Sequence, residues 1–228
     1  MLKFYYSAAP NPTKVALFLE ETGMPFEAIP VDTRKGDQHK PEFLAINPNA
    51  KVPAIVDGDA VVFDSSAILI YLAEKTGKFL PAKTDKARGE LLSWMFFVSS
   101  GVGPYAGQSV HFRNYAPEKL PYAINRYAFE AQRHFGILDT RLAKQKYMLG
   151  DTYTIVDMNV WGWARLMPNV LGEGAWDKFK SLKRLVDEVS ARPAAQKALT
   201  LKDRHKFKTD MDQEALHAMF PHLKEKVA

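Results

Sequence analysis

The chain has 228 residues, 46% hydrophobic and 25% charged, a formal net charge of +5 and no cysteine. This composition is ordinary for a well-cored globular chain, and it excludes a disulfide framework, thiolate metal sites and a protein-borne thiol nucleophile. Any thiol chemistry must therefore come from a bound small molecule. No apolar run approaches the roughly 20 residues that span a bilayer. We expect Met1 to lead into a strand instead of a signal peptide, so the cytoplasm is the expected location.

The positive charge is unevenly spread. Residues 1–80 contain 8 Lys and Arg against 10 Asp and Glu, a net of −2, which leaves 23 against 16, or +7, for the rest of the chain. A mildly basic half favours an anionic ligand. Nucleic-acid binding usually comes with a dense basic stripe and a recognisable motif, and neither is found here. We therefore expect no nucleic-acid partner.

The first 80 residues change repeatedly between strand and helix patterns. Pro12 fits the first turn of a helix, and the run Asp57-Gly58-Asp59 is a strong signal for a hairpin turn. The predicted elements are strands at 2–6 and 26–31, helices at 14–21, 41–45 and 65–75, and a hairpin of 52–56 and 61–63. Their order, β-α-β-α-β-β-α, predicts an α/β domain in which a parallel crossover is followed by an antiparallel hairpin.

Everything beyond residues 78–85, which include Pro81, carries helical periodicity. We expect a long helix at 86–112 that is interrupted near Gly101, Gly103 and Pro104. Later helices are expected near Tyr153, at 176–190 and from Pro193. Between them, one helix shows apolar residues every three or four positions, namely Ile124, Tyr127, Ala131, Phe135, Leu138 and Leu142. The predicted domains are 1–80 and 86–200, followed by a polar tail at 201–228 that the sequence does not place.

Two stretches of the first domain suggest a peptide site. In residues 47–54, an X-Pro bond allows a cis peptide at Pro53, which would turn the backbone N–H and C=O of Val52 towards a groove for an added peptide strand. Shortly afterwards, Ser65 opens a helix whose free N–H groups suit a carboxylate, and Asp64 can accept from an ammonium group. The alternative interpretation, with each stretch taken separately, is that Pro53 starts an edge strand and that Asp64 and Ser65 cap a helix.

In this order the two stretches resemble the glutathione-binding pattern of the cytosolic glutathione transferases. The resemblance implies a glutathione transferase fold, with a thioredoxin-like α/β N-terminal domain and an all-α C-terminal helical domain. It implies that the chain binds glutathione or glutathione disulfide through Lys51, Val52, Pro53, Asp64 and Ser65. The cysteinyl backbone would pair with Val52, and the γ-glutamyl head group would lie against Asp64 and Ser65.

Within this superfamily the sequence is most similar to the bacterial Nu-class transferases. These are also described as glutathione-dependent disulfide-bond oxidoreductases, and they are related to the yeast nitrogen regulator with a transferase fold. The similarity extends over about residues 1–200. The matching positions are Pro10-Asn11, Lys14, Val31-Asp32, 35–38, 40–44, 47–49, 73–77, Gly103-Pro104, Gly107-Gln108, His111-Phe112, 121–124 and Arg126-Tyr127.

A catalytic donor must favour the glutathione thiolate, because the thiol pKa lies near 8.5. In the Nu-like branch a Thr and an Asn follow the first strand, and the resemblance places them at Ala9 and Asn11. Ala9 has no hydroxyl, so the catalytic role falls to Asn11 or a backbone N–H of its loop. Ser7 and Thr13 are alternative donors. The two tyrosines of the first strand, by comparison, are more readily explained as core residues.

Two further roles are implied only by the resemblance. Gln38 would contact the glycine end of glutathione, and Arg126 would reach the ligand of the partner subunit across a homodimer interface. Alternatively, Gln38 is a loop amide and Arg126 a solvated helix residue. His111 has no evident partner acid and is expected to be structural or to line the cleft. The six histidines show no metal-ligand spacing, so no metal is expected.

Residues 153–158 resemble the capping box of the sixth helix of this family. Thr154 and Asp157 would satisfy each other's helix-start N–H groups, with Asp in place of the usual Glu or Gln. This is a folding device, and we expect neither residue to be catalytic.

The absence of cysteine fits an enzyme that binds its thiol. One glutathione thiolate would attack a small disulfide and a second would resolve the mixed disulfide; in conjugation, a detoxification reaction, the same thiolate would attack an electrophile in a groove lined by residues such as Phe112 and Trp163. The sequence leaves the choice open. A non-catalytic glutathione-binding or regulatory module is the alternative, favoured by Ala9. A dehalogenase or isomerase of another glutathione class is a further alternative, but this sequence lacks the Ser or Cys that such an enzyme is expected to have after the first strand.

Overall fold

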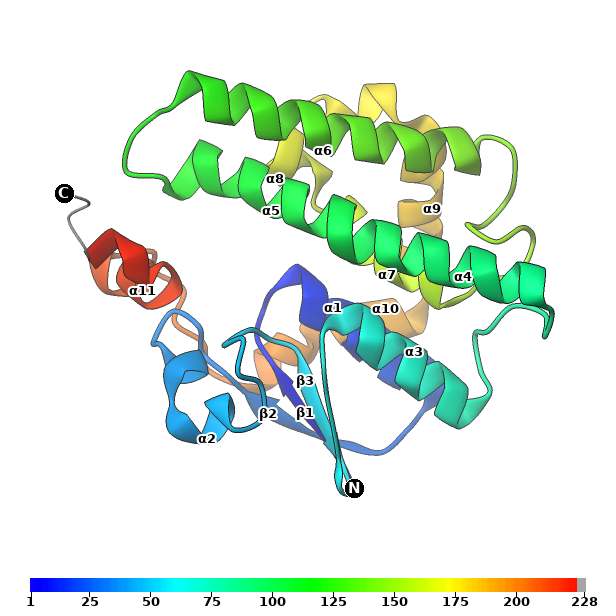
Figure 1. Cartoon of the computed structure of the whole chain (residues 1–228), viewed down its shortest axis with the longest axis horizontal. Coiled ribbons are helices and arrows are strands. Elements are labelled where there is room, and N and C mark those ends of the chain that lie inside the picture. Colours follow the sequence, from blue (N-terminus) through cyan, green and yellow to red (C-terminus); the bar gives the residue numbers. More distant parts are fainter. Residues whose placement is uncertain (225–228) are drawn as a thin grey trace. The chain divides into compact units, whose positions relative to one another are not determined.

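The structure, a computed structural model, describes residues 1–224 of the chain (Figure 1). These residues form two compact units, Met1–Ile68 together with the stretch from Lys197 onward, and Leu69–Gln196. The division between the units falls inside helix α3 (Ser65–Thr76). The predicted domains at 1–80 and 86–200 stay predictions. The stretch after residue 200, which the sequence left unplaced, belongs to the first unit.

The first unit is built on a four-stranded mixed sheet of order β2-β1-β3-β4. β1 pairs with β2 in parallel and with β3 antiparallel, and β4 returns antiparallel beside β3. The strands are β1 (Leu2–Tyr6), β2 (Phe26–Pro30), β3 (Ala54–Asp57) and β4 (Ala60–Phe63). The predicted β-α-β-α-β-β-α order is confirmed, and the predicted turn at residues 57–59 joins β3 to β4.

The helices of this unit begin where the sequence supplies compatible residues. α1 (Pro10–Thr22) begins at Pro10, four residues before the predicted start, since proline fits the first helical position. It ends at Gly23, whose φ of 68° is the left-handed conformation common after a helix. A short α2 (Pro41–Leu44) follows, and α3 begins directly after β4. Alternate residues of β1 (Leu2, Phe4, Tyr6) and most of α1 are buried and form the core.

The described stretch after residue 200 contains a 3-10 turn at Leu201–Arg204, helix α11 (Gln213–Met219) and a second 3-10 turn at Pro221–Lys224. Its first part packs on β1, because the Tyr6 hydroxyl donates to the Leu201 carbonyl at 3.0 Å and the Phe207 ring lies edge-on to the Tyr6 ring at 5.6 Å. These contacts hold the segment against β1, although its polar sequence shows no helical periodicity from which its position could be predicted.

The second unit is helical, as predicted. Its helices are α4 (Asp85–Phe97), α5 (Gly103–Val110), α6 (Pro121–Leu142), α7 (Ile155–Ala164), α8 (Met167–Leu171) and α9 (Lys180–Ser190); α10 (Pro193–Thr200) runs into the first unit. In Figure 1, α6 runs alongside α4 and α5. The predicted interruption near Gly101 is a π-helical turn at Val98–Val102. A Cβ on Gly101 would lie 2.6 Å from the His134 ring, so glycine permits this close helix contact.

The predicted buried face of α6 is present. Ala131, Phe135, Leu138 and Leu142 are buried, while Ile124 and Tyr127 are partly buried. The helix expected at 176–190 begins only at Lys180, after a 3-10 turn at Ala175–Lys178, and the short α8 was not predicted. Thr154 and Asp157 form the predicted capping box at the start of α7.

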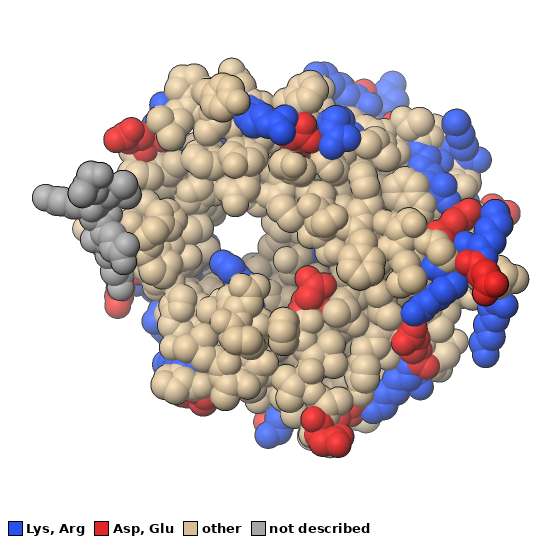
Figure 2. Space-filling view, in the orientation of Figure 1, with Lys and Arg blue, Asp and Glu red and all other residues tan. Residues whose placement is uncertain are grey.

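No helix within residues 1–224 is both long and apolar enough to cross a membrane. On the face shown in Figure 2, lysine and arginine side chains are intermingled with aspartate and glutamate. That face presents no continuous basic stripe. The expectation of no nucleic-acid partner stays a prediction.

Candidate functional site

The loop before β3 exposes an unpaired backbone. The Val52–Pro53 peptide is cis. Asn47, which is 1% exposed, shapes the loop: its Nδ2 donates to the Lys51 carbonyl at 2.6 Å, and its Oδ1 accepts from the Asn49 N–H at 3.0 Å. Within residues 1–224, neither the N–H nor the C=O of Val52 has a hydrogen-bond partner. The backbone of Val52 is therefore available to an added peptide strand.

The start of α3 offers groups suited to a zwitterion. Asp64 has a φ of 70°, and its Oδ1 caps the helix by accepting from the N–H groups of Ser66 at 2.8 Å and Ala67 at 3.1 Å. Neither of these bonds uses Oδ2. The N–H of Ser65 has no partner among the described residues. Asp64 thus caps the helix, as the simpler interpretation expects, and keeps one carboxylate oxygen for a cation.

A buried lysine lies behind this helix start. Lys14 of α1 is 1% exposed, and its Nζ donates to the Ser65 Oγ at 3.4 Å. Burial lowers the pKa of Lys14 to about 7, and the nearby Asp64 carboxylate acts in the opposite direction. From the sequence, Lys14 was one of the matching positions and was not predicted to belong to the site. A lone lysine among the apolar residues of α1 was the available signal.

The turn between β1 and α1 carries the candidate thiolate donors. Asn11 lies in the first turn of α1 and is partly buried. The helix cap, Ala9, makes no side-chain hydrogen bond. Thr13 Oγ1 donates to the Ala9 carbonyl at 2.9 Å, so its hydroxyl proton is already used. Ser7 is 6% exposed, and its Oγ has no hydrogen-bond partner in the described part of the chain.

The two tyrosines of β1 serve packing. The Tyr6 hydroxyl is bonded to the Leu201 carbonyl and lies 2.7 Å from His205 Nδ1, and burial raises its pKa. The Tyr5 ring packs on Phe43 with centroids 6.0 Å apart. Neither geometry favours a phenol that activates a thiol.

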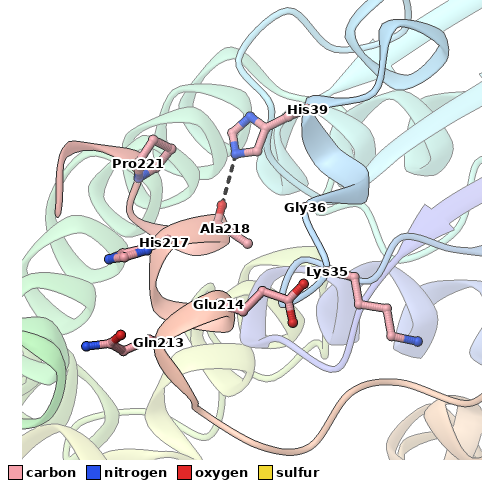
Figure 3. A pocket seen from close by; sticks show the side chains of 8 residues that line it. All are labelled: Lys35, Gly36, His39, Gln213, Glu214, His217, Ala218 and Pro221. Atoms are coloured by element: carbon pink, nitrogen blue, oxygen red, sulfur yellow. Dashed lines mark hydrogen bonds between the residues drawn. The ribbon is translucent and has the colours of Figure 1, made fainter. Parts of the chain in front are cut away.

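Gln38 is held by the end of the chain. It lies in a 3-10 turn at Asp37–His39, is 4% exposed, and its Nε2 donates to the carbonyls of Thr33 at 3.2 Å and Ala218 at 2.8 Å. His39 Nε2 lies 3.0 Å from the same Ala218 carbonyl (Figure 3). Both amide protons of Gln38 are thus used, while its Oε1 is buried without a partner among residues 1–224. In this arrangement Gln38 offers a ligand an acceptor, whereas a glycine carboxylate needs a donor.

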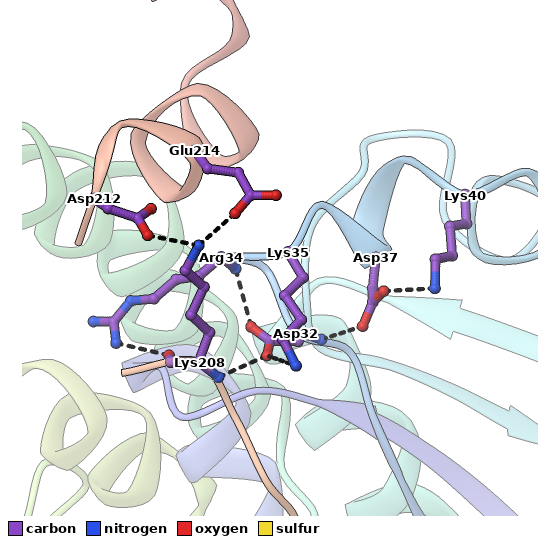
Figure 4. A network of polar contacts seen from close by, with 8 residues as sticks. All are labelled: Asp32, Arg34, Lys35, Asp37, Lys40, Lys208, Asp212 and Glu214. Atoms are coloured by element: carbon purple, nitrogen blue, oxygen red, sulfur yellow. Dashed lines mark hydrogen bonds and ion pairs between the residues drawn. The ribbon is translucent and has the colours of Figure 1, made fainter. Parts of the chain in front are cut away.

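Residues 206–219, which we call the C-terminal strap, are fastened to the loop 32–39 by polar contacts (Figure 4). Arg34 Nη1 donates to the carbonyls of Lys208 at 3.0 Å and Thr209 at 2.7 Å, and the Lys208 N–H donates to Asp32 Oδ2 at 2.7 Å. A groove of about 770 Å³ lies between the loop and α11, lined by Lys35, Gly36, His39, Gln213, Glu214, His217, Ala218 and Pro221 (Figure 3). Gln38 can reach a ligand as a donor only if the strap gives up this contact.

We expect Arg34→Ala to loosen the strap. The change removes two charge-assisted bonds to carbonyls, each worth about 1.5 kcal/mol or more, so amide hydrogen exchange of residues 206–219 should quicken roughly tenfold or more. Lys35→Ala is the matched control, since Lys35 is exposed and its Nζ lies a long 3.6 Å from Asp32 Oδ2. Equal exchange in the two variants would mean that Arg34 does not hold the strap.

The remaining predicted residues lie in the second unit. Arg126 of α6 is half exposed and forms an ion pair with Glu130 at 2.8 Å, one turn away on the same helix. Phe112 stacks on Tyr127 with centroids 5.1 Å apart. The Trp163 ring packs closely against the second unit's glycines at 103 and 107. The groove between domains and the role of Arg126 across a dimer stay predictions.

A four-stranded mixed sheet with a cis-proline before β3 and a capped helix start after β4 is the arrangement of a thioredoxin-like unit, and here it is joined to a helical unit. Family models match both parts: the glutathione S-transferase N-terminal domain matches residues 8–75, and the C-terminal domain matches residues 126–193. The chain belongs to the glutathione S-transferase family.

Individual relatives agree. The disulfide-bond oxidoreductase YfcG of Escherichia coli is 39% identical over 213 residues, which cover 87% of this chain and 94% of YfcG. A glutathione transferase from Burkholderia graminis, solved with two glutathione molecules per subunit, has a TM-score of 0.83 and 35% identity over 90% of this chain and 89% of its own. A glutathione transferase from Pseudomonas putida, solved with one glutathione disulfide per subunit, has a TM-score of 0.81 and 33% identity. The match covers 88% of this chain and 91% of the Pseudomonas putida chain.

Proposed function

We propose that the chain binds glutathione in its first unit and uses the glutathione thiolate to reduce disulfide bonds. The single observation that carries the proposal is that the unpaired Val52 backbone and the unpaired Ser65 N–H lie in one unit of this fold. The first can pair with the cysteinyl backbone and the second with the γ-glutamyl carboxylate. The name of YfcG and the glutathione disulfide bound in the Pseudomonas putida relative support disulfide reduction.

The reaction requires two molecules of glutathione, because this chain has no cysteine. The first thiolate attacks one sulfur of the substrate disulfide, forms a mixed disulfide and releases the other sulfur as a thiol. A second glutathione thiolate then attacks the mixed disulfide and yields glutathione disulfide and the second substrate thiol. Asn11, at the start of α1, would stabilise the reacting thiolate. Conjugation to an electrophile begins from the same activated sulfur.

We further propose that the chain is a Nu-class-like enzyme that works as a cytoplasmic homodimer. Arg126 of one subunit would face the ligand of the other. Lys51 and Pro53 would line the cysteinyl part of glutathione. Gln38 would contact the glycine end once the C-terminal strap releases its amide.

A non-catalytic glutathione-binding or regulatory module is the second candidate. The observation that favours it is the α1 cap, where Ala9 provides no hydroxyl. Saturable binding of glutathione without turnover would select this candidate.

Binding tests the proposal directly. We expect Ser65→Ala to weaken glutathione binding roughly tenfold, as measured by isothermal titration calorimetry. The change keeps the backbone N–H but removes the side-chain hydroxyl, whose hydrogen bond to the charged γ-glutamyl carboxylate is worth about 1.5 kcal/mol or more. Ser66→Ala is the matched control, because Ser66 is the next residue of α3 and is also 4% exposed. Absence of glutathione binding by the unaltered protein would overturn the proposal.

A further inference from the structure

Lys14 presents a problem of burial that the fold does not solve. A buried ammonium is costly unless it is paired and hydrogen-bonded, and an ammonium has three N–H donors to satisfy. Lys14 is 1% exposed, yet the hydrogen bond found for its Nζ within residues 1–224 is the long one to Ser65 Oγ, at 3.4 Å. The charged group that acts on it there is Asp64, at the start of α3. Asp64 already accepts from two N–H groups of that helix.

We propose that Lys14 is a positioning residue for the γ-glutamyl end of the site. Its ammonium orients the Ser65 hydroxyl and places a positive charge near the bound γ-glutamyl carboxylate. The inference rests on the proposed function. An ammonium can only donate, so the Ser65 oxygen must accept from it. The hydroxyl proton of Ser65 is then left to point at another acceptor, and a ligand carboxylate is the acceptor that this helix start favours.

The protonation state of Lys14 decides the direction of this hydroxyl. A neutral amine can accept, so the Ser65 hydroxyl can turn inward and donate to Nζ, and the site loses both a donor and a charge. Burial lowers the pKa of Lys14 to about 7, and a bound anion raises it again. Ligand binding is therefore coupled to proton uptake by a side chain that would make no direct contact with the reacting sulfur.

Because of this coupling, the affinity for the ligand should fall as the pH rises. Below about pH 7 Lys14 is already protonated and binding is tight, and as the pH rises through 7 the protein must take up a proton to bind, so the affinity falls. The probe is S-methylglutathione, whose sulfur cannot ionise. The titration of the thiol is thereby removed from the measurement.

We expect Lys14→Met to weaken binding of S-methylglutathione roughly tenfold at about pH 6, which corresponds to a pKa raised by about one unit in the complex. At about pH 8.5 the unaltered protein and the variant should agree within about twofold. Calorimetry in buffers of different ionisation enthalpy should show uptake of about half a proton near pH 7.5 by the unaltered protein and none by the variant. A merely structural lysine would weaken binding equally at every pH.

Three controls keep the inference falsifiable. Lys3→Met removes an exposed lysine of β1 and should leave the pH profile unchanged. Lys14→Met should unfold at the same temperature as the unaltered protein or higher, because replacing a buried charge with an apolar residue of similar size is often neutral or stabilising. The double change with Ser65→Ala should be less than additive, since Lys14 acts through Ser65.

The outcomes separate the two proposals. If the unaltered protein binds S-methylglutathione and Lys14→Met shows the same affinity and the same pH profile, the role of Lys14 is wrong and the proposed function stands. If the unaltered protein binds neither S-methylglutathione nor glutathione, the proposed function itself fails.

Discussion

Replacing Asn11 with alanine should lower the kcat/KM of glutathione-dependent disulfide reduction by roughly 10- to 100-fold, the effect of losing one hydrogen bond to a charged group, worth about 1.5 to 3 kcal/mol. Asn11 lies in the first turn of α1, beside a cap that has no hydroxyl of its own. Because Ala9 has no hydroxyl, we propose the Asn11 amide as the group that favours the thiolate. Steady-state kinetics with 2-hydroxyethyl disulfide measures the change.

Ser7→Ala is the decisive comparison for this prediction. The Ser7 hydroxyl is buried without a hydrogen-bond partner in the described residues, so it is the other candidate donor near the end of β1. We expect Ser7→Ala to retain most of the activity. A collapse in Ser7→Ala with full activity in Asn11→Ala would assign the thiolate to the serine hydroxyl and contradict our choice.

Replacing Asp157 with alanine should destabilise the protein by about 3 kcal/mol, because it leaves buried N–H donors without acceptors. Asp157 is fully buried at the start of α7, and its carboxylate accepts from the N–H of Met148 and from the N–H and hydroxyl of Thr154 at 2.8 to 3.1 Å. Urea unfolding measures the loss. Asp151→Ala, at an exposed position just before this helix, should change stability by less than about 0.5 kcal/mol.

The effect of Asp157 should also depend on pH. Burial raises its pKa to about 6, against the hydrogen bonds that lower it. Because the folded-state value lies above the unfolded value of about 3.9, the proton-linked part of this carboxyl's contribution to stability is present below about pH 4 and is lost as the pH rises through 6. The difference between the unaltered protein and Asp157→Ala should therefore be larger at about pH 5 than at about pH 7. An equal difference at both would mean that the pKa of Asp157 is not raised.

The elements with local signals were predictable from the sequence. The turn at residues 57–59, the capping box of Thr154 and Asp157, and the interruption near Gly101 each depend on residues a few positions apart. The cis peptide before Pro53 was predictable as well, because only proline commonly permits it.

The strap and its consequences were not predictable in this way. Gln38 and Ala218 are separated by 180 residues, and the contact between them depends on where the end of the chain folds back. The strap is polar, and much of what holds it is hydrogen bonds from Arg34 and Asp32 to backbone groups, which carry no sequence pattern. The role that the family resemblance implies for Gln38, contact with the glycine end of glutathione, could not indicate that both N–H groups of its amide are already hydrogen-bonded.

Lys14 shows the same limit for a single residue. Its position in the first turns of an apolar helix was visible, but its burial and its bond to Ser65 arise only when α1 and the start of α3 come together. Sequence patterns identify residues that could bind a ligand. Which buried charge lies behind them is a property of the folded unit.

The decisive assay for disulfide reduction is glutathione-dependent reduction of 2-hydroxyethyl disulfide, followed through coupled NADPH oxidation. We expect turnover by the unaltered protein well above that of free glutathione, with saturation in glutathione. Turnover no faster than free glutathione would contradict it and leave conjugation or a purely binding role as the function of this site.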